Sequence, residues 1–161
     1  MLIVRVHPQL LDAQRLPPSA RQGPIWKERF DDINAYERHL HRSGVVIRKF
    51  FLNVSKQRQK QRFLERLEQP KKYWKFSATD VRERAHWDAY MAAYEDMIRH
   101  TATAHSPWYV VPADHKWFTR IVVAHAVAEA LADLKLAFPK PDRDRRKELA
   151  AARAALESDR I

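Results

Sequence analysis

The sequence predicts a layered α/β fold in which parallel strands lie between helices. Three short stretches have the nearly continuous apolar character of buried strands: Leu2–Val6, Val45–Val54 and Trp108–Val111. Helical patterns separate these stretches, and strands that alternate with helices typically form a parallel sheet with helices on both faces. With 161 residues, the chain has the size of one ordinary domain.

The first helical pattern runs from about Trp26 to His41, after a loop that contains prolines. Phe30 and Leu40 belong to its apolar side, and Gly44 follows where a glycine commonly ends a helix. This segment is therefore predicted to be an amphipathic helix that covers one face of the sheet.

Further helices are predicted after the second strand. Ser55 is placed to cap a basic helix that ends near Leu67, and Asp80 is placed to cap a longer helix that ends near His100. The last long helix is predicted over about Lys116–Leu136, and charged, alanine-rich residues follow it. We therefore divide the chain into a main part, residues 1–137, and a charged C-terminal helix or tail, residues 138–161.

Composition limits the class of partner. The chain carries 30 Lys and Arg against 20 Asp and Glu, a net charge of +10, so its partners should be anionic. Nucleic acid, phosphorylated small molecules, polyphosphate and anionic membrane surfaces all fit this charge. The absence of cysteine fits a reducing compartment, and the apolar N-terminal run is too short for a signal peptide, so we expect a cytoplasmic protein.

Several site motifs are missing from the sequence. Gly23 and Gly44 are the two glycines, and neither belongs to a G-x-x-x-x-G-K-[ST] or G-x-G-x-x-G phosphate-binding loop. The histidines form no H-E-x-x-H pattern and no serine lies in G-x-S-x-G, so neither a metal site nor a hydrolase triad is predicted. If the protein is a nucleotide enzyme, its phosphate cradle lies outside this sequence.

One segment, Ser55–Lys75, is strongly basic; we call it the basic segment. It contains only two acidic residues against eight basic ones, which are Lys56, Arg58, Lys60, Arg62, Arg66, Lys71, Lys72 and Lys75. Arg58, Arg62 and Arg66 recur every four positions, so on a helix they line one face. That face suits a phosphate chain, and it equally fits an ordinary solvated helix face.

Two further polar residues have alternative interpretations. Arg84 lies one turn before Trp87 on an apolar stripe, where it needs an anion. Asp80 or Asp88, each four residues away, supplies that anion in one interpretation, and a phosphate supplies it in the other. Asp114 follows the third strand, where it fits a helix N-cap or a contact to a base or phosphate.

Four motifs occur together in one order: Trp26–Asn34, Lys49–Lys56, Trp74–Ser77 and Pro107–Trp117. In order and spacing they resemble the second family of polyphosphate kinases, and the resemblance extends over about Leu2–Leu136. It implies a three-layer P-loop kinase-like fold of parallel strands with a helical lid at about residues 56–101. It also implies phosphoryl transfer between inorganic polyphosphate and ADP, GDP or AMP, with Mg²⁺ as cofactor.

The resemblance implies roles for particular residues. Arg62 and Arg84 are expected to contact the transferring phosphates as catalytic residues. Asp114 and Lys116 are expected to contact the nucleotide. The polyphosphate path is expected to be lined by the remaining basic residues of the site, which are Lys56, Arg58, Arg66 and Lys75.

The family's phosphate-binding loop, and the aspartate–arginine pair that serves magnesium and phosphate, precede the first strand of this sequence. We therefore expect this sequence to be the C-terminal portion of such a kinase and to be inactive alone. A truncated gene, a mis-called start or a split enzyme would each explain the missing loop. Expected partners are polyphosphate, the nucleotide, and a second copy or a missing N-terminal half, without a specific nucleic acid or a membrane. The competing hypotheses are a non-catalytic polyphosphate- or anion-binding module and, ranked last, a nucleic-acid binder.

Overall fold

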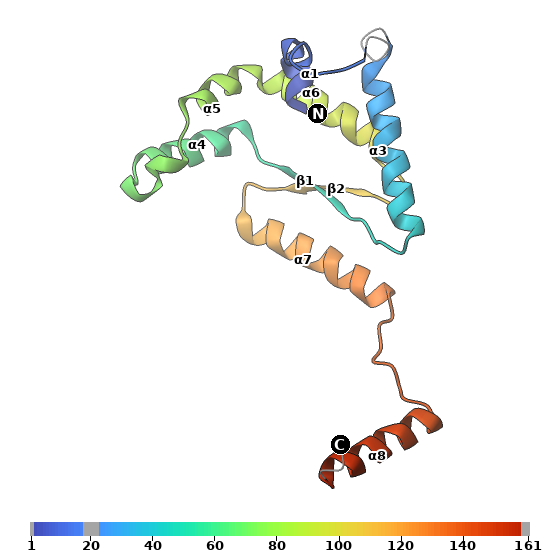
Figure 1. Ribbon diagram of the computed structural model, residues 1–161. Coiled ribbons are helices and arrows are strands. Elements are labelled where there is room, and N and C mark those ends of the chain that lie inside the picture. The colour runs from blue at the N-terminus through green and yellow to red at the C-terminus, as the bar shows by residue number, and fades with distance from the viewer. Residues whose placement is uncertain (1, 18–22, 159–161) are drawn as a thin grey trace. The chain divides into compact units, whose positions relative to one another are not determined.

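A computed structural model describes residues 2–17 and 23–158. The chain forms two compact units, Met1–Ala128 and Glu129–Ile161. The first unit holds both strands and most of the helices, up to the greater part of helix α7, Lys116–Asp133 (Figure 1). The second unit holds the end of α7 and helix α8, Arg143–Glu157.

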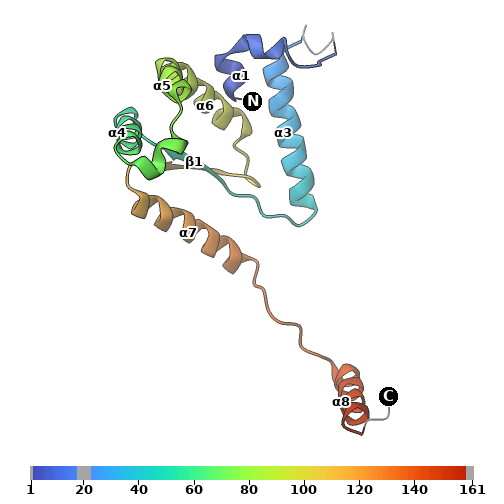
Figure 2. The same ribbon diagram turned by 60° about the vertical axis from the view of Figure 1, so that its left-hand side comes forward.

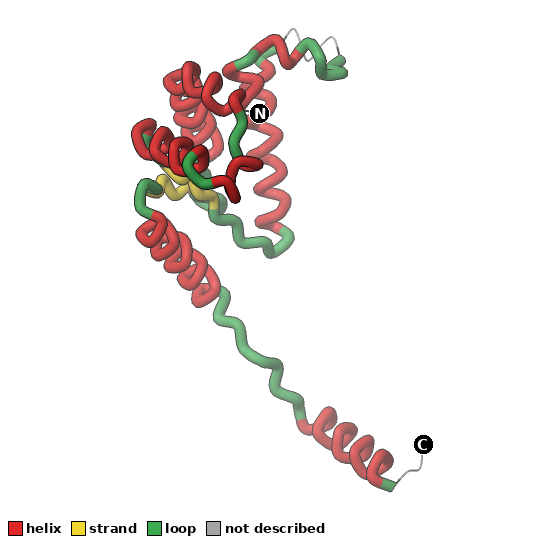
Figure 3. The backbone as a smooth tube through the Cα atoms, turned by 90° about the vertical axis from the view of Figure 1, so that its left-hand side faces the viewer, coloured by secondary structure: helices red, strands yellow, loops and turns green. Residues whose placement is uncertain are grey.

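The sheet of the first unit has two parallel strands. Strand β1, Lys49–Asn53, pairs with strand β2, Trp108–Pro112, in a register that places Lys49 opposite Trp108. The connection between them consists of helices, so this is a mixed α/β fold with a small parallel sheet (Figure 3). Helices α3, Ile25–Arg42, and α6, Trp87–Thr101, lie on one side of the strands in both Figure 1 and Figure 2.

Two of the three predicted strands exist. The prediction for Trp108–Val111 is confirmed, and Val111 is almost completely buried. The prediction for Val45–Val54 was too long, because β1 begins only at Lys49. Val45 and Val46 are exposed beside the turn at Gly44, and the amide of Val45 donates to the carbonyl of Leu40 at the end of α3, whereas the register with β2 begins at Lys49.

The prediction of a strand at Leu2–Val6 was wrong, because these residues form helix α1. The helix packs against α6: Val4 is buried, and Arg5 forms an ion pair with Asp96. The guanidinium of Arg5 also lies 5.1 Å from the ring centroid of Trp26. A run of five residues is too short for its apolar pattern to distinguish a strand from a buried helix.

Helix α3 confirms the amphipathic helix predicted from Trp26 to His41. Phe30 is its buried residue, and its ring stacks on that of His100 at 5.0 Å. Gly44 has a φ of 86°, the left-handed conformation that glycine adopts without a steric penalty. The backbone therefore reverses after α3 and enters β1.

The connection between the strands differs in part from the prediction. Ser55 caps helix α4, Lys56–Leu67, as expected, since its hydroxyl accepts a hydrogen bond from the amide of Arg58. Asp80 caps no helix: Ser77 is the capping residue, and Asp80 lies inside helix α5, Ala78–Glu83. The predicted long helix is thereby broken into pieces. The elements of this connection are α4, Lys56–Leu67; η2, Pro70–Lys75; α5, Ala78–Glu83; η3, Arg84–His86; and α6.

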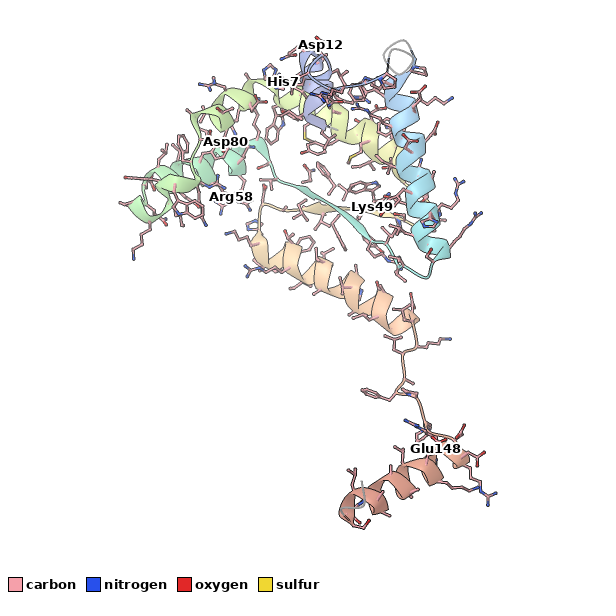
Figure 4. The ribbon with its side chains drawn as sticks, in the orientation of Figure 1. His7, Asp12, Lys49, Arg58, Asp80 and Glu148 are labelled. Atoms are coloured by element: carbon pink, nitrogen blue, oxygen red, sulfur yellow. The ribbon has the colours of Figure 1, made fainter. Side chains whose placement is uncertain are left out.

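A partly buried polar network joins the sheet to α3 and α6. The ammonium of Lys49, which is labelled in Figure 4, donates to the Glu37 carboxylate and to the Thr101 carbonyl, both at 2.6 Å. The indole of Trp108 donates to the Thr101 hydroxyl at 2.9 Å. Because the four residues come from α3, β1, α6 and β2, this network holds the first unit together in one arrangement.

Candidate functional site

The candidate site lies where both strands end. Asn53 is the last residue of β1 and Pro112 the last of β2, and the amide of Ala113 donates to the Asn53 carbonyl at 2.9 Å. From this edge the chain enters α4 after β1 and α7 after β2. Ligands of open α/β sheets commonly bind at the carboxyl ends of the strands, where helix starts and turns meet.

Asp114 connects the two exits from the sheet. Its Oδ1 accepts a hydrogen bond from the backbone amide of Ser55 at 2.7 Å. Hydrogen bonds from the backbone and side chain of Ser55 lower the pKa of Asp114, and the charges of His115 and Arg62 lower it further. The carboxylate is therefore ionised near neutral pH. Asp114 stabilises the start of α4. The N-cap interpretation had instead placed Asp114 at the start of the helix that follows it, α7.

The two expected catalytic arginines are half-buried, and the guanidinium of each donates a hydrogen bond to a main-chain carbonyl of another residue. Arg62 Nη2 donates to the carbonyl of Ala113 at 2.8 Å, while its Nε is buried without a hydrogen-bond partner. Arg84 Nη1 donates to the carbonyl of Lys56 at 3.1 Å, and it contacts the amide oxygen of Gln59 at 2.5 Å.

These contacts correct the sequence interpretation of Arg84. Neither Asp80 nor Asp88, which were considered as its anion, pairs with it in the described chain; α4 supplies oxygen atoms from Lys56 and Gln59 instead. Because a guanidinium has five N–H donors, both arginines retain donors for a further acceptor. The bonds to main-chain carbonyls limit the freedom of the two side chains before any ligand binds.

The four residues expected along the polyphosphate path have mixed environments. Lys56 and Lys75 are exposed, and their ammonium groups lie 6.0 Å from the Trp87 ring and 4.9 Å from the Trp74 ring. Arg58 pairs with Glu65 at 3.1 Å and is labelled in Figure 4.

Arg66 lies against the ring of Phe63, 5.5 Å from its centroid. Lys116, expected to contact the nucleotide, is exposed at the first position of α7. Exposed lysines keep their charge available to a polyanion, whereas Arg58 shares its charge with a carboxylate.

Two separate cavities border these residues. A cavity of about 290 Å³ is lined by β1 and by aromatic residues of α6, and Arg84 and Gln59 belong to its wall. A second cavity of about 350 Å³ is lined by Arg58, Asp114 and other polar residues at the start of α4. The structure therefore does not bring all the predicted residues into one pocket: Arg84 of η3 borders the first cavity, and Arg58 of α4 borders the second.

Sequence reasoning missed a cluster that borders the first cavity. His7 Nε2 lies 2.8 Å from Glu83 Oε2, which also accepts from the Tyr90 hydroxyl at 2.8 Å. These hydrogen bonds lower the pKa of Glu83, whereas burial and the neighbouring carboxylate raise the pKa of Tyr90 to about 12. His7 is far from the other two in the sequence, and no local spacing indicates the contact.

The described residues do not fit a magnesium site. Within residues 2–17 and 23–158, no three carboxylate or imidazole groups gather closely enough to hold a metal ion. The magnesium that the family resemblance implies therefore has no ligand set among these residues. None of the described helices is long and apolar enough to cross a membrane.

Comparison with known proteins identifies the family. Residues 21–139 match the family model described as Polyphosphate kinase 2. The chain belongs to the polyphosphate kinase 2 family. The sequence-based resemblance is thereby confirmed, and the members of this family are phosphotransferases.

Two relatives and one solved structure show the extent of the match. The chain is 50% identical over 135 residues to an uncharacterized protein of Leptolyngbya boryana, covering 84% of this chain and 99% of that protein. It is 45% identical over 157 residues to the ADP-polyphosphate phosphotransferase of Rhodopseudomonas palustris, covering 97% of this chain and 54% of that enzyme.

The crystal structure of Polyphosphate Kinase 2 from Arthrobacter aurescens matches with a TM-score of 0.79 and 39% identity, over 97% of this chain and 50% of that one. The chain thus spans about half the length of the two named kinases.

Proposed function

We propose that this chain supplies the cationic lid and the C-terminal strands of a polyphosphate:nucleotide phosphotransferase. The substrates are inorganic polyphosphate and ADP, GDP or AMP, and the two strands belong to a three-layer P-loop kinase-like fold with residues 56–101 as the lid. The observation that carries the proposal is the placement of Arg62 and Arg84. Both are half-buried, attached to main-chain carbonyls and next to the carboxyl edge of a parallel sheet.

Phosphoryl transfer requires the protein mainly to align the reactants and to neutralise charge on the transferring group. Arg62 and Arg84 suit this role because a planar guanidinium binds two phosphate oxygens at once. In the proposed enzyme they contact the transferring phosphates, and Lys56, Arg58 and Arg66 hold the following phosphates of the chain. Lys75 extends this path, while Asp114 and Lys116 lie at the nucleotide end.

Exposed apolar side chains support an association with further protein. Leu52 on β1 is 48% exposed, Val110 on β2 is 55% exposed and Ile121 on α7 is 60% exposed, although parallel strands are normally covered on both faces. We propose that a second copy, or a segment equivalent to the other half of the longer relatives, covers these residues. The proposed location is the cytoplasm, and Mg²⁺ would bind through groups outside the described residues.

Polyphosphate binding by the purified chain tests the proposal. Binding should weaken steeply with salt because cations that bind a linear polyanion release its counterions. If about five lysines and arginines bind phosphates, the slope of log K against log salt is about −3 to −4. Arg62→Gln and Arg84→Gln should each reduce affinity several-fold. Arg145→Gln on α8 removes the same charge from an exposed pair with Glu148, so it serves as the matched control.

A transfer assay separates the enzyme from the alternative, a non-catalytic polyphosphate-binding module. This alternative is favoured by one observation, which is that the sequence contains no glycine-rich phosphate loop. We expect no measurable transfer from polyphosphate to ADP by the chain alone, and transfer after addition of the remaining half of a longer relative. Binding that never leads to transfer in this mixture would favour the module. Absence of salt-dependent binding would contradict both functions.

A further inference from the structure

The turn after β2 is attached to α4 at two points. Asp114 Oδ1 accepts from the amide of Ser55 at 2.7 Å, and the carbonyl of Ala113 accepts from Arg62 at 2.8 Å. The two donor residues, Ser55 and Arg62, are about two helical turns apart, or roughly 10 Å along the axis of α4. With a single hydrogen bond to the turn, α4 could rotate about that contact. Two hydrogen bonds from residues this far apart in the helix also fix its tilt relative to the sheet.

The sequence of α4 explains why its start needs an external acceptor. In a capping box, the side chain of the third helical residue accepts a hydrogen bond from the amide of the N-cap residue. In α4 the N-cap is Ser55, and the third residue is Arg58, which has no acceptor. The carboxylate of Asp114, brought from the other strand, takes the place of the missing glutamate.

We infer that Asp114 is a positioning residue: it completes the cap of α4, fixes this helix to the end of the sheet, and thereby sets where Arg62 points. The first turn of α4 contains no acidic residue, although the positive end of the helix dipole favours one. Asp114 provides that negative charge from outside the helix. The same bonds lower the pKa of Asp114, so the attachment persists through the neutral pH range.

The functional consequence of this inference rests on the proposed function. If α4 presents cations to polyphosphate, loss of the Asp114 attachment weakens binding by changing the direction of the helix, without removing a contact to the ligand. The structural claim is independent of the ligand, because it concerns the amides at the start of α4. Hydrogen exchange of these amides therefore tests it directly.

The experiment compares amide hydrogen exchange in the full chain and its variants. Asp114→Ala removes the acceptor, and exchange over Ser55–Gln59 should become about tenfold faster or more. Asp114→Asn keeps a carbonyl oxygen in the same place, so it should restore much of the protection. Asp133→Ala, a change of the same charge at an exposed position on α7, is the control and should leave these amides unchanged.

A pH series adds a readout that a purely steric role would not produce. In the wild type, protection of the Ser55 amide, corrected for intrinsic exchange, should decrease toward the level of the Asp114→Asn variant as pH falls through the lowered pKa of Asp114. The Asp114→Asn variant should show no such step. This comparison remains decisive even if Asp114→Ala fails to fold.

Two outcomes would overturn the inference. Unchanged exchange over Ser55–Gln59 in both variants would show that Asp114 does not hold the helix start. Loss of polyphosphate or ADP binding in Asp114→Asn, with protection at the wild-type level, would make Asp114 a direct ligand contact. If the wild type binds no polyphosphate, the proposed function fails, while the exchange data still decide the role of Asp114.

Discussion

Replacing Lys49 by methionine should destabilise the first unit by about 3 kcal/mol. Lys49 and its partner Glu37 are only 13% and 12% exposed, and the ammonium also serves the carbonyl of Thr101. Methionine fills the space of the aliphatic stem but leaves a buried carboxylate and a buried carbonyl without their donor. Breaking a buried pair from one side costs about 3–5 kcal/mol, and the residual exposure of both groups favours the lower value.

The assay is thermal and urea unfolding at pH 7, followed by circular dichroism. For a domain of this size, about 3 kcal/mol corresponds to a Tm lower by roughly 6–12 °C. The double variant Lys49→Met with Glu37→Met should recover most of the loss, since an apolar pair replaces both charges. Arg99→Met is the matched control: its pair with Glu95 is 72% and 64% exposed, so the change should cost less than about 0.5 kcal/mol.

Two results would refute this reasoning. A Tm of Lys49→Met within about 2 °C of the wild type would mean that solvent reaches the Glu37 carboxylate and replaces the lost donor. A double variant no more stable than the single one would mean that Lys49 acts through packing against the Trp108 ring, 5.2 Å away, and not through its charge.

Three further outcomes are expected. Gly44→Ala should lower the free energy of unfolding, measured in urea, by about 1–2 kcal/mol. The cause is the backbone φ of 86°, since the added methyl group would itself meet open space. Gly44→Asn should cost less. Hydrogen bonds from His7 and Tyr90 hold the pKa of Glu83 below its ordinary value, so its stabilising effect is present above that ordinary value and is lost as pH falls through the lowered pKa. When the pH is lowered, the Tm of Glu83→Gln should accordingly decrease less than the Tm of the wild type. Tyr90, with a pKa of about 12, should titrate last among the tyrosines in ultraviolet absorbance, and Tyr90→Phe should abolish that step; a uniform titration near pH 10 would contradict this.

Local patterns were sufficient where they were long or carried a capping residue. The amphipathic helix from Trp26, the cap at Ser55 and the end of the first helix at Gly44 were all predicted, because each depends on residues within a few positions. The family was recognised from four motifs in order, which a chance match does not reproduce. Short or interrupted patterns misled: Leu2–Val6 is helical because it packs on α6, and propensity over five residues is too weak to resist that contact.

The sequence by itself determined the cationic character of the chain, the helix from Trp26, two of its strands, and the family to which it belongs. Only the tertiary structure decided which groups act on one another at the candidate site. Asp114 and Ser55 meet because β1 and β2 are parallel neighbours that end together, and Arg84 meets Gln59 because the chain folds back after α4. Such contacts join residues that are far apart in the chain. The spacing of residues along the sequence indicates only which side chains share a face of one helix or strand, so it does not predict these contacts.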